Sequence, residues 1–278
     1  MNKALTYLCT LGAAVSSLLT SCSFDSILTP EKTTPSYVAM EVNSGRVLYS
    51  SNSNIKRPIG MLANLATAVV VMDWIKAQQV DMNRLITVPA QATVWQRTNL
   101  LNLRAGDYIS VRDALYSALM WDDSTCATAL ACACGETLSS GNPEGAFIAQ
   151  MNNLARRLGM TSTVFKGTNG AVITQSSARD MALLGMYAIN DPDLLAITAQ
   201  TGCVVTIHTP TGARRQTIRN NNKLLSGSGH VDGLKVGQSR SAGNCLMVTA
   251  RHLYSSPFSV KVLSASSFET SVLTNGFF

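Results

Sequence analysis

Charged residues are scarce in this chain of 278 residues, where they make up 14% of the sequence against about 25% in an ordinary domain. The 22 Lys and Arg exceed the 16 Asp and Glu, which gives a formal net charge of +6. These basic residues form no long run of one sign, so the sequence does not indicate a nucleic-acid-binding protein. The hydrophobic share of 46% is that of a folded core and excludes a disordered chain.

Histidine is equally rare. The chain has three histidines, and they lie far apart: His208, His230 and His252. No cysteine or carboxylate stands at metal-ligand spacing beside them, which argues against a zinc site. We therefore expect neither a metal nor a cofactor.

The first 21 residues are predicted to be a secretory signal peptide. Lys3 is followed by an apolar stretch over residues 4–19, which is too short to span a membrane comfortably. The stretch ends in Leu19-Thr20-Ser21-Cys22, which resembles the lipobox of bacterial lipoproteins. This resemblance implies cleavage before Cys22 and attachment of lipid to its sulfur. The alternative is a simple N-terminal membrane anchor with an incidental cysteine.

Three regions are expected along the chain. Residues 1–21 form the signal peptide, 22–35 a lipidated tether rich in Ser, Thr and Pro, and 36–278 one folded domain. The expected location is a bacterial membrane, with the domain facing the periplasm or the cell surface. The membrane is thus one expected partner, reached through the lipid on Cys22.

Export makes disulfides chemically accessible, but an odd number of cysteines remains in the folded domain. These are Cys126, Cys132, Cys134, Cys203 and Cys245. We interpret most of them as small buried apolar residues, and the sequence leaves their pairing open.

Strand patterns at both ends of the domain with helices between them predict an α+β fold. An Asn-Ser-Gly turn at 43–45 predicts a hairpin of strands 37–42 and 46–50. Helices are predicted over 59–75, 111–121, 124–137, 146–158 and 177–189. Further strands are predicted at 203–207, 215–218, 234–236, 245–251 and 258–263. We expect the N-terminal hairpin to join the C-terminal strands in one antiparallel sheet, with the helical region inserted.

Several segments together resemble the serine D-alanyl-D-alanine carboxypeptidases, the low-molecular-mass penicillin-binding proteins with a β-lactamase-like fold. The main ones are 37–49, Lys56-Arg57-Pro58-Ile59-Gly60 and Val231-Asp232-Gly233-Leu234-Lys235-Val236-Gly237. Shorter ones are Leu158-Gly159-Met160, 177–182, 220–225 and Asn275-Gly276-Phe277. Taken in order, these segments cover nearly the whole domain, and we expect no counterpart in residues 36–278 of the extra C-terminal β-rich domain of the family.

Active members of this family need three motifs around one cleft: Ser-x-x-Lys, Ser-x-Asn and Lys-Thr-Gly. The first position reads Met61-Leu62-Ala63-Asn64, the second Asp122-Asp123-Ser124 and the third Lys235-Val236-Gly237. Methionine has no nucleophilic oxygen, and an asparagine amide is no general base near neutral pH. The catalytic groups are therefore replaced at Met61, Asn64, Asp122 and Ser124, and Lys235 remains as the only cation.

Three interpretations of this pattern stay open. In the first, the protein is a pseudoenzyme that binds cell-wall peptide, glycan or a protein partner. In the second, it is an active carboxypeptidase with another nucleophile, for which Ser124 and Ser239 are the available hydroxyls. In the third, it is a structural or interaction lipoprotein without a functional cleft. Function has to be argued from the site and not from the fold.

A ligand anchor is predicted at the third motif. A peptide or a carboxylate would be held there by Lys235, Val236, Gly237 and Arg240. The alternative is that Lys235 and Arg240 are simply solvated cations, since edge strands often carry charge. The basic stretch of Arg214, Arg215, Arg219 and Lys223 is better explained as a solvated face than as a polymer-binding surface.

Neighbouring residues are given structural roles. Met61 is expected to fill the emptied nucleophile pocket. Asp122 and Asp123 are expected to stabilise the N-terminus of the following helix, since adjacent side chains point apart. Trp121 is expected to be half-buried.

Overall fold

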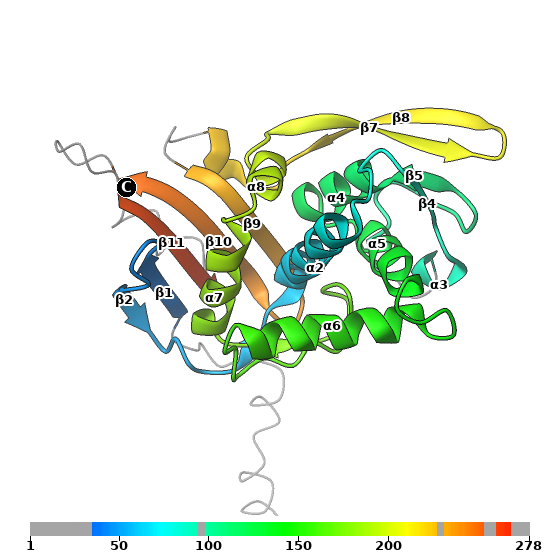
Figure 1. Cartoon of the computed structure of the whole chain (residues 1–278). Coiled ribbons are helices and arrows are strands. Elements are labelled where there is room, and N and C mark those ends of the chain that lie inside the picture. The colour runs from blue at the N-terminus through cyan, green and yellow to red at the C-terminus, as the bar shows by residue number, and fades with distance from the viewer. Residues whose placement is uncertain (1–34, 94–97, 227–230, 253–259, 268–278) are drawn as a thin grey trace, which may run out of the picture. The chain divides into compact units, whose positions relative to one another are not determined.

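The structure is a computed structural model, and it describes residues 35–93, 98–226, 231–252 and 260–267. Its main sheet has five antiparallel strands in the order β2-β1-β11-β10-β9 (Figure 1). The strands are β1 (Ser36–Glu41), β2 (Val47–Ser51), β9 (Val231–Ser239), β10 (Gly243–His252) and β11 (Val260–Ser267). β1 pairs with β11, with Ala39 opposite Ser264. The predicted α+β class is confirmed, and so is the joining of N-terminal and C-terminal strands in one sheet.

Helices fill the space beside this sheet (Figure 1). The central group is α2 (Ala63–Gln78), α4 (Val111–Met120), α5 (Ser124–Glu136) and α6 (Pro143–Arg157). α7 (Ala178–Ala188) packs against β1 and β11, and α8 (Pro192–Thr198) packs against β9. The five predicted helices are confirmed, whereas α8 was missed because its seven residues are too few to show a period.

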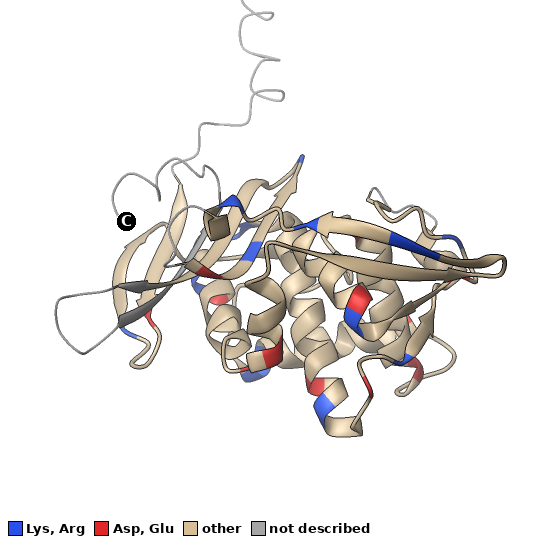
Figure 2. Ribbon diagram, turned by 90° about the horizontal axis from the view of Figure 1, so that it is seen from above, with Lys and Arg blue, Asp and Glu red and all other residues tan. Residues whose placement is uncertain are grey.

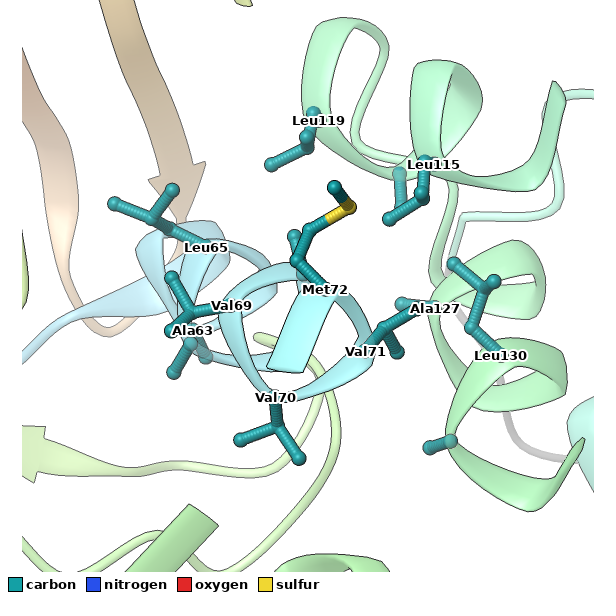
Figure 3. Packing of buried hydrophobic residues seen from close by; sticks show 14 of the residues in the cluster. Ala63, Leu65, Val69, Val70, Val71, Met72, Leu115, Leu119, Ala127 and Leu130 are labelled. Atoms are coloured by element: carbon teal, nitrogen blue, oxygen red, sulfur yellow. The ribbon is translucent and has the colours of Figure 1, made fainter. Parts of the chain in front are cut away.

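α2 is the central core helix. A window within residues 60–78 is apolar enough to cross a membrane, but 83% of it is buried inside the structure, which identifies a core helix of the folded domain. Figure 3 shows Met72 of α2 beside Leu115 and Leu119 of α4, and Val71 beside Ala127 of α5. The small residues of α5 bring its backbone close to α2, and burial of these side chains stabilises the fold.

A second sheet corrects the sequence prediction. The strands at 203–207 and 215–218 do exist, as β7 (Gly202–Thr209) and β8 (Gly212–Arg219), but they do not join the main sheet. They form a four-stranded sheet in the order β4-β5-β7-β8 with β4 (Leu85–Thr87) and β5 (Tyr108–Ser110). The two partner strands have three residues each, too few for an alternating pattern to reveal them.

Short elements complete the described fold. They are β3 (Arg57–Pro58), the 3₁₀ turn η2 (Gly60–Leu62), α3 (Ala90–Thr93), β6 (Gln175–Ser176) and the 3₁₀ turn η3 (Lys223–Ser226). β3 pairs with β6, and this ladder leads the chain into η2 and α2. The segment that precedes the candidate site is therefore held by backbone hydrogen bonds and is not a long loop.

The cysteines behave as predicted. Within the described residues no disulfide joins Cys126, Cys132, Cys134, Cys203 and Cys245, and all but the half-buried Cys203 are buried. Burial raises the pKa of the Cys134 thiol to about 12, so this group stays protonated and behaves as a small apolar side chain.

Charged residues are scattered over loops, helices and the β7–β8 hairpin (Figure 2). This pattern agrees with the absence of long charge runs. Several predictions lie outside the described residues. They concern the signal peptide, the tether up to residue 34 with Cys22, and the closing Asn275-Gly276-Phe277 segment.

Candidate functional site

Three segments far apart in sequence meet at one place, as the motif spacing predicts. They are η2 with the start of α2, the start of α5, and strand β9. The sulfur of Met61 lies 3.9 Å from the hydroxyl oxygen of Ser124. β9 packs against η2, which brings the third motif to the first. The structure thus brings Met61 and Ser124 together, and places Gly237 directly beside Met61.

Glycine makes this close approach sterically feasible. A Cβ added to Gly237 would lie 2.7 Å from the Leu62 nitrogen and 2.9 Å from the Met61 carbonyl carbon, distances that real side chains do not reach. In the same way, a Cβ added to Gly170 would lie 2.4 Å from the carbonyl carbon of Gly60. Gly237, retained from the third motif, is therefore required by packing on η2, whatever else it does.

Asn64 is fully buried on the first turn of α2. Its amide nitrogen donates to the backbone carbonyl of Ala118 at 3.0 Å, while its side-chain oxygen has no partner among the described residues. A buried acceptor without a partner costs about 1–3 kcal/mol. Asn64 therefore links α2 to α4 and takes no part in activating a nucleophile at position 61.

Ser124 is buried and bonded to neutral groups. Its hydroxyl lies 2.5 Å from the hydroxyl of Thr98, and its backbone N–H donates to the Thr98 carbonyl at 2.9 Å. Asn169 donates from its amide to the Ser124 carbonyl at 3.4 Å. Among the described residues this hydroxyl contacts the Thr98 hydroxyl and the Met61 sulfur and no histidine, carboxylate or amine, so nothing here deprotonates it. Thr98 and Asn169 were missed by the sequence analysis because both lie in loops without a recognisable pattern.

Lys235, the surviving cation, is already paired. Its side chain is completely buried and its ammonium forms an ion pair with the carboxylate of Asp122. It also donates to the carbonyl of Val236. The second carboxylate oxygen of Asp122 accepts from the amide of Asn221 at 3.2 Å. The cation is thus neutralised from within the chain.

The expected role of Asp122 in stabilising a helix N-terminus is wrong. Asp122 has a left-handed backbone with φ of 62°, which turns its side chain toward β9. Asp123 does act as predicted, because it is the N-cap of α5 and accepts from the Cys126 N–H at 2.9 Å. It also accepts from the Leu101 N–H at 3.0 Å. The two adjacent carboxylates point apart, as expected.

The remaining predicted residues lie at the rim. Arg240 is exposed, Val236 is half-buried, and Trp121 is half-buried against the core as expected. Ser239 bonds to Ser241 at 3.3 Å and accepts from the Ala242 N–H at 3.1 Å, so it also lacks a base. Within the described residues, no three His, Cys, Asp or Glu side chains gather where they could hold a metal ion.

The arginines of the basic stretch lie in two different environments. The guanidinium of Arg214 donates to the backbone carbonyls of Leu101 and Asn102, so it ties the β7–β8 hairpin to a neighbouring loop. Arg215 and Arg219 are exposed on β8, in agreement with the expectation of a solvated face.

One Ser-x-x-Lys sequence does occur in the chain, at Ser53-Asn54-Ile55-Lys56. It lies in the turn between β2 and β3, where the Ile55 N–H donates to the Asn52 carbonyl at 3.0 Å. Lys56 is exposed. The motif works on a helix because three residues bring serine and lysine to one face, and a turn does not do this.

We expect that restoring catalytic residue types at the first motif destabilises the protein. Met61→Ser removes buried apolar volume and should lower the free energy of unfolding by about 1–3 kcal/mol. Asn64→Lys places a cation in a fully buried position without a carboxylate partner and should cost at least as much. Urea denaturation measures both, and two variants as stable as the parent would contradict the interpretation that these residues repack the site.

Asp123 gives a pH-dependent expectation. Burial raises its pKa, although N–H donors from Cys126 and Leu101 oppose the shift. The folded state then holds the Asp123 proton more tightly than the unfolded state does. The stability that this proton contributes is fully present below the pKa that Asp123 has in the unfolded chain. It is lost as pH rises through the higher folded pKa. Relative to the Asp123→Asn variant, the parent should therefore become less stable as the pH rises from acid toward neutral. A pH-independent difference would contradict this.

Comparison with known proteins agrees with this geometry. The family described as D-alanyl-D-alanine carboxypeptidase matches residues 25–266. D-alanyl-D-alanine carboxypeptidase DacC of Escherichia coli strain K12 is 31% identical over 77% of this chain and 52% of its own length. D-alanyl-D-alanine endopeptidase of Pseudomonas aeruginosa is 28% identical over 86% of this chain and 73% of its own. The chain spans about half the length of the carboxypeptidases DacC and DacA.

The fold has close counterparts among solved structures. The Streptomyces K15 DD-transpeptidase superposes with a TM-score of 0.74 at 23% identity, covering 86% of this chain and 91% of the transpeptidase. D-alanyl-D-alanine carboxypeptidase DacD of Francisella tularensis gives a TM-score of 0.72 at 22% identity, over 87% and 67% of the two chains. The family match over residues 25–266 and the similarity to DacC show that this chain belongs to the D-alanyl-D-alanine carboxypeptidase family of low-molecular-mass penicillin-binding proteins.

Proposed function

We propose that this protein is a non-catalytic member of its family, which keeps the fold and has lost the acylation chemistry. The observation that carries the proposal is the replacement of both the nucleophile and its base. In the motif alignment inferred from the sequence, the buried Met61 takes the serine position and Asn64, which donates to the carbonyl of Ala118, takes the lysine position. Without an activated hydroxyl, attack on a peptide carbonyl has no starting group.

A rebuilt mechanism through Ser124 has little to support it. Its hydroxyl has Thr98 and the sulfur of Met61 as partners, and neither accepts a proton near neutral pH. Lys235 is bonded to Asp122 instead. Loss of the nucleophile costs about a million-fold in turnover in a well-studied serine hydrolase, so an unactivated serine does not replace it.

We infer that the remaining site binds a ligand without forming a covalent bond to it. Relatives bear the name D-alanyl-D-alanine carboxypeptidase, so cell-wall peptide is the chemistry to test first. β9 is the last strand in the order of the main sheet, and such an edge offers backbone groups to an extended peptide. The exposed Arg240 lies just beyond β9, where it would attract a carboxylate.

A specific observation favours a second candidate, an interaction protein of the envelope without a working cleft. The cation expected to receive a ligand carboxylate is occupied by Asp122. A peptide would have to displace this partner or bind without Lys235. The choice between the two candidates therefore depends on whether any peptide binds, and whether Lys235 contributes.

Calorimetry with a peptide ending in D-Ala-D-Ala tests the proposal. We expect saturable binding of millimolar to micromolar affinity, weakened at least about fivefold by Arg240→Ala. Arg215→Ala, an exposed arginine on β8, is the matched control and should have no effect. A peptide ending in L-Ala-L-Ala controls for stereochemistry. Absence of heat at millimolar peptide would favour the interaction protein.

We also propose that the protein is an exported lipoprotein anchored through Cys22. The support is the apolar segment followed by Leu19-Thr20-Ser21-Cys22. Cys22→Ala should abolish labelling with a fatty-acid analogue and leave the protein unprocessed or released from membranes. Unchanged labelling and fractionation would contradict the lipid anchor, and Cys203→Ala is the control.

A further inference from the structure

A groove of about 650 Å³ lies away from the motif residues, between the C-terminal parts of α2 and α6 and the segment after α5. We call it the α2–α6 groove. Its apolar wall includes Val70 and Ala77 of α2, Leu138 after α5, and Leu154 of α6. The volume is that of an ordinary small-molecule site, which spans about 300–1,000 Å³. None of Met61, Ser124 and Lys235 lines it.

Three side-chain acceptors of the groove, including its carboxylate, are already in use. The carboxylate of Asp73 accepts from the Tyr187 hydroxyl at 3.0 and 3.2 Å, and pairs with Arg157 at 3.4 Å. The amide oxygen of Asn153 accepts from Arg156, and that of Gln150 accepts from Asn153 at 3.3 Å. Little negative charge is therefore left to receive a ligand donor.

Donors, in contrast, are in surplus. The indole N–H of Trp74 is buried and has no partner among the described residues. Such a group costs about 1–3 kcal/mol when left unpaired. Arg156 and Arg157 each carry five N–H donors, and each is shown bonding to one neighbouring side chain. Both arginines lie at the C-terminal end of α6, where their charge also interacts favourably with the helix dipole. The unpaired indole N–H of Trp74 is a separate observation, because Trp74 belongs to α2.

We propose that the α2–α6 groove binds a small amphiphilic anion, with a carboxylate or phosphate group on an apolar body. The acidic group would meet the guanidinium groups of Arg156 and Arg157, which suit either anion. The apolar body would lie along Val70, Ala77 and Leu154 beside the Trp74 ring. This inference rests on the groove alone and does not depend on the function proposed for the motif residues.

Nitrogen-15 NMR of the full chain tests this site directly. The chain has three tryptophans, so it gives three indole N–H signals, and Trp74→Phe identifies the one from Trp74. Sodium octanoate, octyl phosphate and the neutral octyl glucoside are titrated to about 10 mM, since small ligands of this kind bind in the millimolar range or tighter. We expect the Trp74 signal to shift saturably with one or both anions. A shift with only one of them identifies the acidic group.

Charge variants decide whether the arginines select the anion. Arg156→Gln with Arg157→Gln should weaken anion binding at least about tenfold. Arg215→Gln with Arg219→Gln removes the same charge from the exposed face of β8 and should leave binding unchanged. The proposal is overturned by an indole signal that no probe moves, by equal shifts with octyl glucoside, or by equal weakening in both double variants.

Discussion

Purified protein should keep its unmodified mass after exposure to a fluorescent penicillin, and it should release no D-alanine from a D-Ala-D-Ala peptide above background. β-Lactams label this family by acylating the nucleophilic serine, so the adduct reports that residue directly. We place Met61 at the position of that serine and Asn64 at the position of its base, and neither side chain can do this chemistry. Intact-protein mass spectrometry followed by peptide mapping makes the measurement, with an active relative as the positive control.

The variants that follow from this prediction are strongly non-additive. Met61→Ser alone should stay inactive, because the new hydroxyl still lacks a base. Recovery should require Asn64→Lys, Ser124→Asn and Val236→Thr in addition, since residues that act as one catalytic unit contribute together. The structure adds Asp122→Ser to this set, because Asp122 otherwise holds the ammonium of Lys235.

A penicilloyl adduct on the unmodified protein would overturn the pseudoenzyme proposal. Its mapped position would then identify the nucleophile. Ser124, Ser239 and Ser53 are the hydroxyls to inspect, the last because it lies in the single Ser-x-x-Lys sequence of the chain. Substitution of the mapped serine by alanine should remove the adduct.

The sequence predicted those parts of the fold that have a clear period or a clear turn. The hairpin at 37–50, the helices and the pairing of both chain ends follow from alternation, helical spacing and an Asn-Ser-Gly turn. β4 and β5 have three residues each, and α8 has seven, so no period could reveal them. For that reason the second sheet was missed and β7 and β8 were placed in the wrong one.

The candidate site shows a different limit. The family resemblance led us to place the motifs at Met61, Ser124 and Lys235, and the structure does bring Met61 and Ser124 together. The resemblance could not show which charges pair across 113 residues, as Lys235 and Asp122 do. It also could not find Thr98, which reaches Ser124 from a loop. Such contacts depend on backbone positions, such as the left-handed φ of Asp122, that a single sequence does not display.

Loss of one partner from the Lys235–Asp122 ion pair should destabilise the protein strongly, whereas loss of both should not. The Lys235 side chain is completely buried and that of Asp122 is 14% exposed. Asp122→Ala leaves a buried ammonium without its carboxylate and should lower the free energy of unfolding by about 3 kcal/mol or more. Lys235→Met should cost less, because Asp122 keeps its bond from Asn221 and some contact with water.

The double variant Asp122→Ala with Lys235→Met separates pairing from packing. It removes both charges and keeps an apolar chain of similar length in the buried position, so its stability should return to within about 1 kcal/mol of the parent. Lys76→Met is the matched control, because Lys76 is 54% exposed in its pair with Asp191 and should contribute less than about 1 kcal/mol. Urea denaturation at low and high salt measures all four variants, and the penalty of Asp122→Ala should persist at high salt because buried charges are poorly screened. If Asp122→Ala were as mild as Lys76→Met, Lys235 would be accessible to solvent and available to a ligand, and its proposed internal neutralisation would be wrong.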